Sequence, residues 1–400
     1  MNKLFKTDQQ QEINKSATPA LVRQMNIRRV VDIIRRNQVL SRAEITRLSG
    51  ISPPTMTKLF EELSHSGIIR EVKSRNSGRG RPSRCYTLSG KTMQVFGAVI
   101  GVEMCRIFTA VPSLKLKKIA EREFATPHSY KEMLLQFRQF IEEQLKGKIQ
   151  FMGLGISVPG LINSNSQTVE ICPNIRYLDG KTPGPDIGNG FSLKTVTIQE
   201  EHALCLAEHV SGNTGTNQNF VMLDISEGMG MGIFVNGEYM SGESGFAGEI
   251  GHIPLGAPEN LCGCGRRGCL ETSATDTALL RMASPSDTDQ LSMETLKKLV
   301  KSGRRDINNE LETVLQYLAK GLGVIINLFN PGLILINGSI FDLKNGLLEI
   351  LIEKVKGNAM QPSFDACEIK LAQVSKDVGV LACISNALVA SIVEISPHNM

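Results

Sequence analysis

A cluster of three cysteines constrains the fold of this chain more than any other stretch of its sequence. Cys262, Cys264 and Cys269 fall within eight residues, and His252 lies ten residues before the first of them. Three thiolates and one imidazole form the closed tetrahedral shell that is usual for a structural Zn²⁺. The alternative is three thiols buried in a loop, but such cysteines seldom cluster in this way. We therefore expect this loop to fold around zinc, with tight turns at Gly263, Gly265 and Gly268.

The charges are divided unevenly along the chain. Residues 1–90 contain 17 Lys and Arg against 7 Asp and Glu, a net charge of +10; because the whole chain carries +4, the remaining 310 residues carry −6. A small basic segment ahead of a larger acidic one is typical of a nucleic-acid-binding module joined to a second domain. Nine cysteines without disulfide-like spacing, and a polar beginning without an apolar run, favour the cytoplasm.

The basic segment has the helix pattern of a helix-turn-helix. Residues 1–20 are polar, and we expect them to be flexible. Apolar residues then recur at helical spacing over 21–37. Ser41 and Glu44 have the spacing of a capping box, which predicts the start of a second, short helix. Ser52, followed by two prolines, predicts the start of a third helix, since proline is well tolerated in a first helical turn.

Two expected strands, over 68–72 and 84–88, follow the helices and flank a turn rich in arginine and glycine. This order is that of a winged helix-turn-helix, so we predict a DNA-binding domain over 21–90; the alternative is a three-helix protein-docking module. The Arg79-Gly-Arg81-Pro82 sequence in the turn resembles an arginine hook for narrow minor grooves. The predicted DNA contacts are Ser52, Thr55, Thr57, Lys58, Arg79, Arg81 and Arg84.

From about residue 92 strands and helices alternate, which indicates an α/β fold. An uncharged stretch over 321–341 is long enough to cross a membrane, but Asn330-Pro331-Gly332 interrupts it. We expect a buried helix, a turn and a buried strand there, and no membrane insertion. The other expected elements are strands over 95–102, 106–111, 151–158, 195–198 and 219–225, and helices over 130–145 and 201–210.

The loop around the cysteines resembles the signature of the ROK family (repressors, open reading frames and sugar kinases). The matching residues are Gly245-Phe-Ala-Gly-Glu249-Ile-Gly-His252 and then Cys-x-Cys-Gly-x-x-Gly-Cys-x-Glu271. The resemblance implies two lobes of the actin-like sugar-kinase fold over 92–395, with a ligand cleft between them. It also implies a winged helix-turn-helix at the beginning, as in many repressors of the family.

The same resemblance implies which residues contact a sugar. Glu249, His252 and Glu271 are expected to bind sugar hydroxyls, His252 while it also binds the metal. Asn174, in a Cys-Pro-Asn element, is expected to bind a further ring hydroxyl. Carboxylate, imidazole and amide groups suit this role because they hydrogen-bond hydroxyls with fixed direction. Gly160, after a buried strand, is expected to leave room for the sugar ring.

The motifs through which active kinases of this family hold ATP differ here. Their first phosphate turn, Asp-x-Gly-Gly-Thr, corresponds to Val99-Ile-Gly-Val-Glu103, and the Thr of their second turn corresponds to Glu227. A carboxylate aimed at a triphosphate is unfavourable by about a few kcal/mol. The catalytic Asp corresponds to Glu201 if the preceding strand is aligned and to Glu200 if the following helix is aligned. Either Glu would misplace the base by about 1 Å, enough to lose roughly 100-fold in rate.

We therefore predict a sugar-responsive transcription regulator, a repressor, that binds sugar without phosphorylating it. Its expected partners are operator DNA, a small sugar effector and further copies of the chain, in a homodimer or homotetramer. The alternatives are an active sugar kinase with a DNA-binding head, or lobes that dock another protein. We expect an unphosphorylated sugar, because Glu200 or Glu201, with Glu227 and Glu103, would repel a 6-phosphate. A basic residue from elsewhere, for example Arg176, would reverse this expectation.

Overall fold

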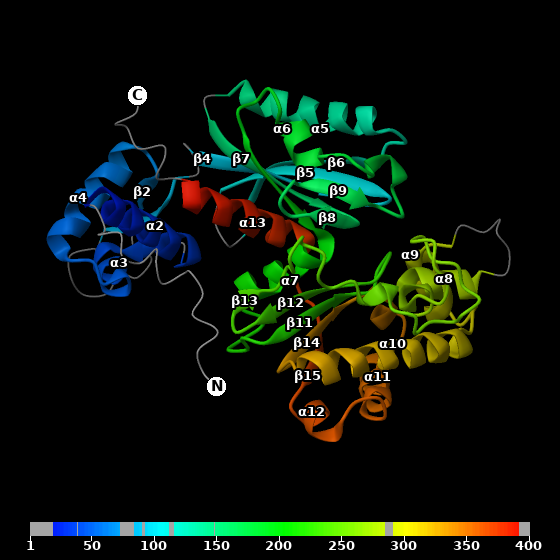
Figure 1. Ribbon diagram of the computed structural model, residues 1–400. Helices are drawn as coiled ribbons and strands as arrows, with labels where there is room; N and C mark the ends of the chain where they lie inside the picture. The colour runs from blue at the N-terminus through cyan, green and yellow to red at the C-terminus, as the bar shows by residue number, and fades with distance from the viewer. Residues whose placement is uncertain are drawn as a thin grey trace, which may run out of the picture.

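The computed structural model describes residues 19–37, 39–72, 84–89, 93–111, 116–147, 149–284 and 291–391. The stretch 1–20, predicted to be flexible, lies outside them except for its last two residues. Arg79 and Arg81 of the predicted basic turn also lie outside the described residues. The described chain forms a small N-terminal head and two larger α/β lobes (Figure 1).

In its described residues, the head contains three helices and a three-stranded antiparallel sheet in the order β1-β3-β2. The predicted capping box is confirmed: the Glu44 N–H donates to the Ser41 hydroxyl, and the Glu44 carboxylate accepts from the Ser41 N–H at 2.8 Å. Gly50, with φ of 67°, ends the same helix. The elements are α2 (Pro19–Asn37), β1 (Leu40–Ser41), α3 (Arg42–Ser49), α4 (Pro53–His65), β2 (Ile69–Val72) and β3 (Cys85–Leu88).

The first lobe is built on a five-stranded sheet in the order β10-β7-β4-β5-β6. Its predicted opening hairpin and the helix over 130–145 are confirmed, whereas β6 was not predicted because half of its residues are charged and none forms an apolar run. The elements are β4 (Met93–Ile100), β5 (Met104–Ala110), β6 (Lys118–Ala125), α5 (Tyr130–Leu145), β7 (Gln150–Val158), β8 (Leu161–Asn163), β9 (Thr168–Ile171), η1 (Arg176–Leu178), α6 (Pro183–Gly188) and β10 (Lys194–Gln199), followed by α7 (Glu200–Ser211).

The second lobe repeats this topology with the sheet order β13-β12-β11-β14-β15. In each lobe the central strand pairs antiparallel with the next strand and parallel with a later one. The elements are β11 (Phe220–Asp224), β12 (Gly230–Val235), β13 (Glu238–Tyr239), η2 (Ile250–His252), η3 (Leu270–Thr272), α8 (Asp276–Ala283), α9 (Met293–Lys301), α10 (Asn308–Phe329), β14 (Leu333–Asn337), η4 (Ser339–Asp342), α11 (Leu347–Lys356), α12 (Gln361–Asp365), β15 (Glu368–Leu371) and α13 (Lys376–Ser391).

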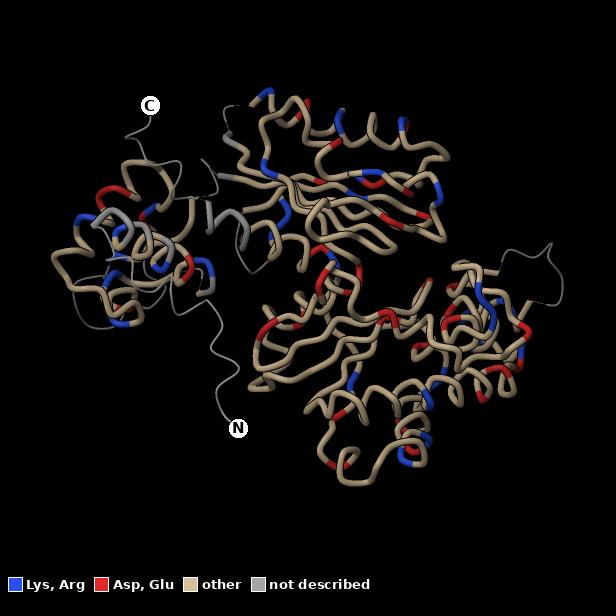
Figure 2. The backbone as a smooth tube through the Cα atoms, viewed as in Figure 1, with Lys and Arg blue, Asp and Glu red and all other residues tan. Residues whose placement is uncertain are grey.

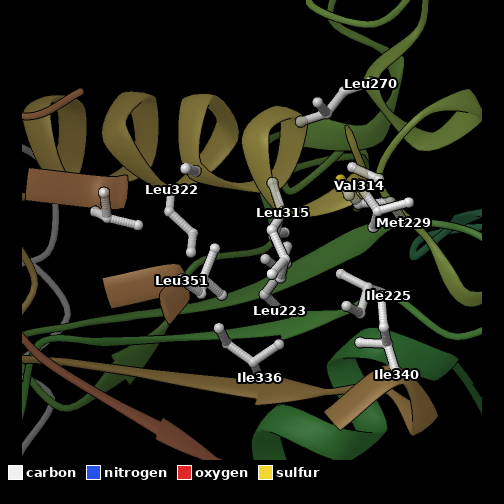
Figure 3. Packing of buried hydrophobic residues seen from close by; sticks show 14 of the residues in the cluster. Leu223, Ile225, Met229, Leu270, Val314, Leu315, Leu322, Ile336, Ile340 and Leu351 are labelled. Atoms are coloured by element: carbon white, nitrogen blue, oxygen red, sulfur yellow. The ribbon is translucent and has the colours of Figure 1, made fainter. Parts of the chain in front are cut away.

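The stretch over 321–341 has the structure that its sequence predicts. Helix α10 ends at Asn330, whose φ of 42° is left-handed, and β14 follows as a buried strand. Figure 3 shows Leu315 of α10 directed at Leu223 of the sheet beneath, and Leu322 of α10 directed at Leu351, which lies above Ile336 of the sheet. Among the described residues, no helix is both long and apolar enough to span a membrane.

Two helices are exchanged between the lobes. Helix α7 follows the last strand of the first lobe but packs on β11 and β12 of the second, while α13 follows the last strand of the second lobe but packs on β4, β7 and β10 of the first. The two helices cross closely: a Cβ on Gly379 of α13 would lie 1.7 Å from the carbonyl oxygen of Ala203 in α7. Helix α13 also contacts α2 of the head, so it connects the lobes with the head (Figure 1).

Candidate functional site

The predicted metal ligands lie together. One ligand atom from each of His252, Cys262, Cys264 and Cys269 lies within 4.8 Å of all the others. The Sγ atoms of Cys264 and Cys269 are 3.6 Å apart, and Cys262 Sγ is 3.6 Å from His252 Nδ1. A tetrahedral ion with bonds of about 2.3 Å requires ligand separations of roughly 3.8 Å, so these four side chains fit a bound Zn²⁺.

Backbone hydrogen bonds fold the loop tightly enough for this cluster. The N–H of Cys262 donates to the carbonyl of Arg266 at 2.8 Å, and the N–H of Gly268 donates to Asn260 at 3.0 Å. Gly265 and Gly268 have φ values of 87° and 74°, the left-handed conformation that glycine adopts without strain. Gly263 is required for another reason: a Cβ there would lie 2.9 Å from Pro173 Cβ.

The imidazole of His252 lies between the cysteine cluster and two acids. Its Nδ1 faces Cys262 and is also 3.7 Å from Glu271, while its Nε2 is 3.7 Å from Glu249 Oε2. A histidine that binds a metal through Nδ1 carries its proton on Nε2, which then donates toward Glu249 or a ligand. The ring can therefore belong to a metal site and to a ligand site at once.

A cavity of about 480 Å³ lies between the lobes beside this cluster. The first lobe, with the start of α7, contributes Asn174 and the two candidate base residues, and the second lobe contributes the residues of the signature loop. All six residues predicted to contact a sugar line it: Asn174, Glu200, Glu201, Glu249, His252 and Glu271. The volume and the convergence of polar groups are typical of a small-molecule site.

Gly160 lines the cavity, but the reason for a glycine there differs from the expected one. This glycine has φ of 88°, and a Cβ there would lie 2.4 Å from the carbonyl oxygen of Ile171 and 2.8 Å from Cys172 Cα. Its missing side chain therefore makes room for the end of β9, not for a ring in the cavity. Arg176 does not reverse the acidic character of the cavity, because it lies 3.6 Å from Asp179 and donates to the Gly263 carbonyl at 2.5 Å.

The two candidate base residues differ in their surroundings. Glu200 Oε1 lies 2.8 Å from Lys376 Nζ, a cation that the sequence analysis missed. The signal available for it was a Lys-Asp pair directly before the last apolar stretch of the sequence. Glu201 instead lies against Gly230, where a Cβ would meet its carboxyl group at 2.6 Å. Removal from water, with the nearby charges of Glu200 and Glu249, raises the pKa of Glu201 to about 8.

Asp224 was also missed as a site residue. It ends β11 at the cavity, accepts from the Ser226 hydroxyl at 2.8 Å and from the Asn337 amide at 2.9 Å, and lies 3.9 Å from Lys376. Its position at the carboxyl end of a central strand, before a glycine-rich hairpin, was the signal available in the sequence. Parallel strands place ligand sites at such ends.

A second chamber of about 340 Å³ adjoins the cavity and shares Glu200 and Glu227 with it. It contains the first-lobe turn, including Gly101 and Glu103. Glu227 reaches across from the second lobe, since it accepts a hydrogen bond from the backbone of Val102; burial and the charge of Glu200 raise its pKa. Glu103 and Glu227 thus place carboxylates from both lobes in one chamber.

The described part of the predicted DNA-binding surface lies on α4 and beside β3. Ser52, Thr55 and Lys58 are exposed, but the Ser52 hydroxyl bonds to Thr55 Oγ1 at 2.9 Å instead of capping α4 as expected. Thr57 is half-buried and accepts from the Arg42 guanidinium. Arg84 is exposed beside Glu71, at 3.5 Å. Figure 2 shows basic segments distributed over the head.

Three comparisons relate this chain to known proteins. A family model described as "ROK family" matches residues 99–388. The xylose repressor of Caldicellulosiruptor bescii is 26% identical over 385 residues, covering 91% of this chain and 96% of that protein. The transcriptional dual regulator NagC of Escherichia coli is also 26% identical, over 355 residues, covering 85% of this chain and 87% of that protein.

Solved structures share the fold. A ROK family transcriptional regulator, a homologue of the E. coli MLC protein, aligns with a TM-score of 0.77 and 24% identity and covers 94% of this chain and 98% of its own. A ROK family glucokinase from Streptomyces griseus, solved with glucose and AMPPNP, aligns with a TM-score of 0.61 and 18% identity over 74% of this chain and 99% of its own. The two lobes therefore have the fold of this group of regulators and sugar kinases, as predicted.

Proposed function

Because the chain belongs to the ROK family, we propose that it is a sugar-responsive, DNA-binding repressor of transcription. The observation that carries this proposal is the cavity between the lobes. There Asn174, Glu249, His252 and Glu271 converge next to the cysteine cluster. Such a set of acceptors and donors suits the vicinal hydroxyls of a sugar. The names of the regulators to which the chain is similar, over most of their length, support the same function.

DNA binding is assigned to the head, a winged helix-turn-helix over 21–90. Its helices α3 and α4 are joined at Gly50, and α4 exposes Ser52, Thr55 and Lys58 for the major groove. The net charge of +10 over residues 1–90 supplies the attraction to phosphate, and Arg79, Arg81 and Arg84 extend it to the wing. The ligand-binding domain spans 92–395. We propose a homodimer or homotetramer in the cytoplasm, because operators usually contain paired half-sites.

The cleft is proposed to bind sugar without phosphorylating it. The chamber next to the sugar cavity is lined by Glu103, Glu123, Glu200 and Glu227, while its cations Arg106 and Lys376 are paired with Asp377 and Glu200. A triphosphate would meet carboxylates there without a free cation among these lining residues, which is unfavourable in a partly buried chamber. A Glu in place of the catalytic Asp adds a further handicap.

The cysteine cluster is proposed to hold a structural Zn²⁺ through His252, Cys262, Cys264 and Cys269. Four protein ligands leave no open position for chemistry on the metal, so its contribution is to fold the loop. The same loop carries Glu249 and Glu271, and the imidazole of His252 faces both. Loss of the metal would therefore displace the residues proposed to bind the sugar.

A phosphoryl-transfer assay tests the proposal against its alternative, a sugar kinase with a DNA-binding head. The full chain, with zinc bound, is incubated with radiolabelled ATP, Mg²⁺ and a panel that includes glucose, xylose and N-acetylglucosamine. We expect no labelled sugar above the background of a heat-treated sample, while calorimetry with the same panel detects binding. Labelled sugar phosphate formed at enzyme-like rates would establish the kinase instead.

A further inference from the structure

Three charged side chains from three different segments meet at the floor of the cleft. Lys376 is the first residue of α13, and its Nζ lies 2.8 Å from Glu200 Oε1 and 3.9 Å from Asp224 Oδ2. The three side chains are largely removed from solvent, with exposed fractions of 19% for Lys376, 9% for Glu200 and 6% for Asp224. Because little water reaches Glu200 and Asp224, the ammonium group of Lys376 is needed to compensate their negative charges.

The two acids belong to different lobes. Glu200 directly follows β10, an edge strand of the first-lobe sheet, and Asp224 ends β11, the central strand of the second. Lys376 comes from the helix that follows the second lobe and packs on the first. The ammonium group of Lys376 therefore attracts one carboxylate at the end of each sheet, at the point where α7 and α13 begin.

The start of α13 is held firmly, so the ammonium group has a fixed place. The next residue, Asp377, is buried and lies 3.2 Å from Arg106 and 2.8 Å from Lys118, both on the first-lobe sheet. Gly379, three residues after Lys376, lies so close to the carbonyl of Ala203 that any side chain there would collide with it. These contacts fix the backbone of Lys376 relative to Glu200.

The electrostatic surroundings keep this lysine charged. Burial alone would lower the pKa of Lys376, but the charges of Glu200 and Asp224 outweigh it, so the pKa is raised. Burial raises the pKa of Glu200, and the neighbouring ammonium group offsets only part of this rise. Glu227 lines the same two chambers as Glu200. Without the lysine, several carboxylates so close together would attract a hard divalent cation.

We propose that Lys376 is a built-in cation that ties the two lobes together across the floor of the cleft and occupies the place that a divalent cation would otherwise take between Glu200 and Asp224. Both lobes then stay joined at this point without Mg²⁺ or nucleotide. This inference concerns the stability and metal preference of the cleft, and it holds whether or not the cavity binds a sugar.

The test measures thermal stability and Mn²⁺ binding of the full chain with zinc bound. Lys376→Ala leaves Glu200 and Asp224 uncompensated and opens space between them. We expect its Tm to fall by roughly 5 °C or more. The matched control is Lys370→Ala, which removes a lysine from an exposed pair with Glu368 at the same 2.8 Å separation. Its Tm should change by no more than about 1 °C.

Adding Glu200→Gln to Lys376→Ala removes one uncompensated charge. The double variant should therefore recover at least about half of the decrease in Tm that Lys376→Ala causes. This double variant also serves if Lys376→Ala alone fails to fold. Millimolar Mn²⁺ should raise the Tm of Lys376→Ala by several degrees and leave the wild-type Tm unchanged, and Mn²⁺ bound to the variant should be visible by electron paramagnetic resonance.

Three results would overturn the proposal. One is a Tm for Lys376→Ala that matches the Lys370→Ala control. Another is a double variant that is as unstable as Lys376→Ala, or fails to fold as it does. The last concerns the metal: Mn²⁺ binding at the cleft of the wild-type chain, or none by the folded Lys376→Ala variant, would show that the lysine does not stand in for a cation. Sugar binding and DNA binding remain separate measurements, so none of these results decides the proposed function.

Discussion

The Sγ atom of Cys262 lies 3.6 Å from the Nδ1 atom of His252, so one imidazole ring joins the cysteine cluster to the cavity between the lobes. The opposite ring nitrogen faces Glu249 at 3.7 Å. A metal bound at the cluster would fix the orientation of this ring and therefore the position of a hydrogen-bond donor in the cavity. Metal binding and ligand binding are thus expected to depend on each other.

The first prediction concerns the metal. Cys264→Ser should lower the zinc content from about one ion per chain to near zero, and should weaken sugar binding by at least roughly tenfold, because the loop also positions Glu249 and Glu271. Elemental analysis and calorimetry measure the two effects. Cys367→Ser is the control, since that half-buried cysteine lies outside the cluster and should change neither. Full zinc content with normal ligand affinity in Cys264→Ser would contradict the prediction.

The second prediction concerns the charge of the ligand. Calorimetry with matched pairs, each sugar against its 6-phosphate, should show binding at least about tenfold weaker for the phosphate, because acids from both lobes line the cavity. Of the two arginines that line this cavity, Arg281 is engaged, since its guanidinium donates to the Thr272 carbonyl; Lys376, in the adjoining chamber, pairs with Glu200. Tighter binding of the 6-phosphate than of its sugar would contradict this prediction. It would indicate that Arg266 or Arg281 at the cavity wall binds the phosphate.

The third prediction concerns pH. The pKa of Glu201 is about 8 in the folded chain, against 4.5 for an ordinary Glu, because the side chain is withdrawn from water and lies near Glu200 and Glu249. Between these values the unfolded chain has lost a proton that the folded chain keeps. The carboxyl group therefore makes the folded state less stable as pH rises from about 5 to 8, by at most about 1.4 kcal/mol per pH unit.

Glu201→Gln removes this contribution, so the stability of the variant relative to the wild type should rise steadily over that pH range and level off above it. Urea unfolding at several pH values measures the difference. Glu142→Gln, at an exposed position on α5, is the control and should follow the wild-type curve. A constant difference between Glu201→Gln and the wild type across pH 5–8 would show that Glu201 ionises normally.

The fourth prediction concerns the wing. Arg79→Ala combined with Arg81→Ala should weaken DNA binding and reduce the slope of log K against log salt concentration by about 1.8, since each phosphate contact contributes roughly 0.9. Both arginines lie outside the described residues, so this prediction rests on the sequence. Lys298→Ala is the control, because that lysine pairs with Glu294 on α9 of the second lobe. An unchanged slope in the double variant would show that these two arginines do not contact DNA and that the wing has another role.

Much of the fold could be predicted because local chemistry decides it. The Ser41–Glu44 capping box, the turn after α10 at Asn330 and the apolar strand β14 all have strong local signals, and each occurs where predicted. Strand β6 had no such signal, since half of its residues are charged and its pairing with β5 at the edge of the sheet decides its conformation. Edge strands lack the continuous apolar run by which a buried strand is found.

The candidate site was predictable where one stretch of sequence carries it, as in the signature loop. It was not predictable where distant segments meet. Lys376 reaches Glu200 and Asp224 only because α13 crosses back over the first lobe, 176 residues beyond Glu200. Gly160 shows the opposite error: its position after a strand suggested room for a ligand, whereas the contact that excludes a side chain comes from Ile171. Such contacts depend on tertiary packing, which no local pattern reports.

The central claim is that a sugar bound between the lobes changes the affinity of the head for DNA. The most direct measurement is a fluorescence anisotropy titration of the full chain, with zinc bound, on a DNA fragment recovered by genomic pull-down. It is repeated with and without a sugar that calorimetry has shown to bind. We predict that the sugar changes the Kd for that fragment by at least about tenfold. An identical Kd with the cavity saturated by the sugar would contradict the account.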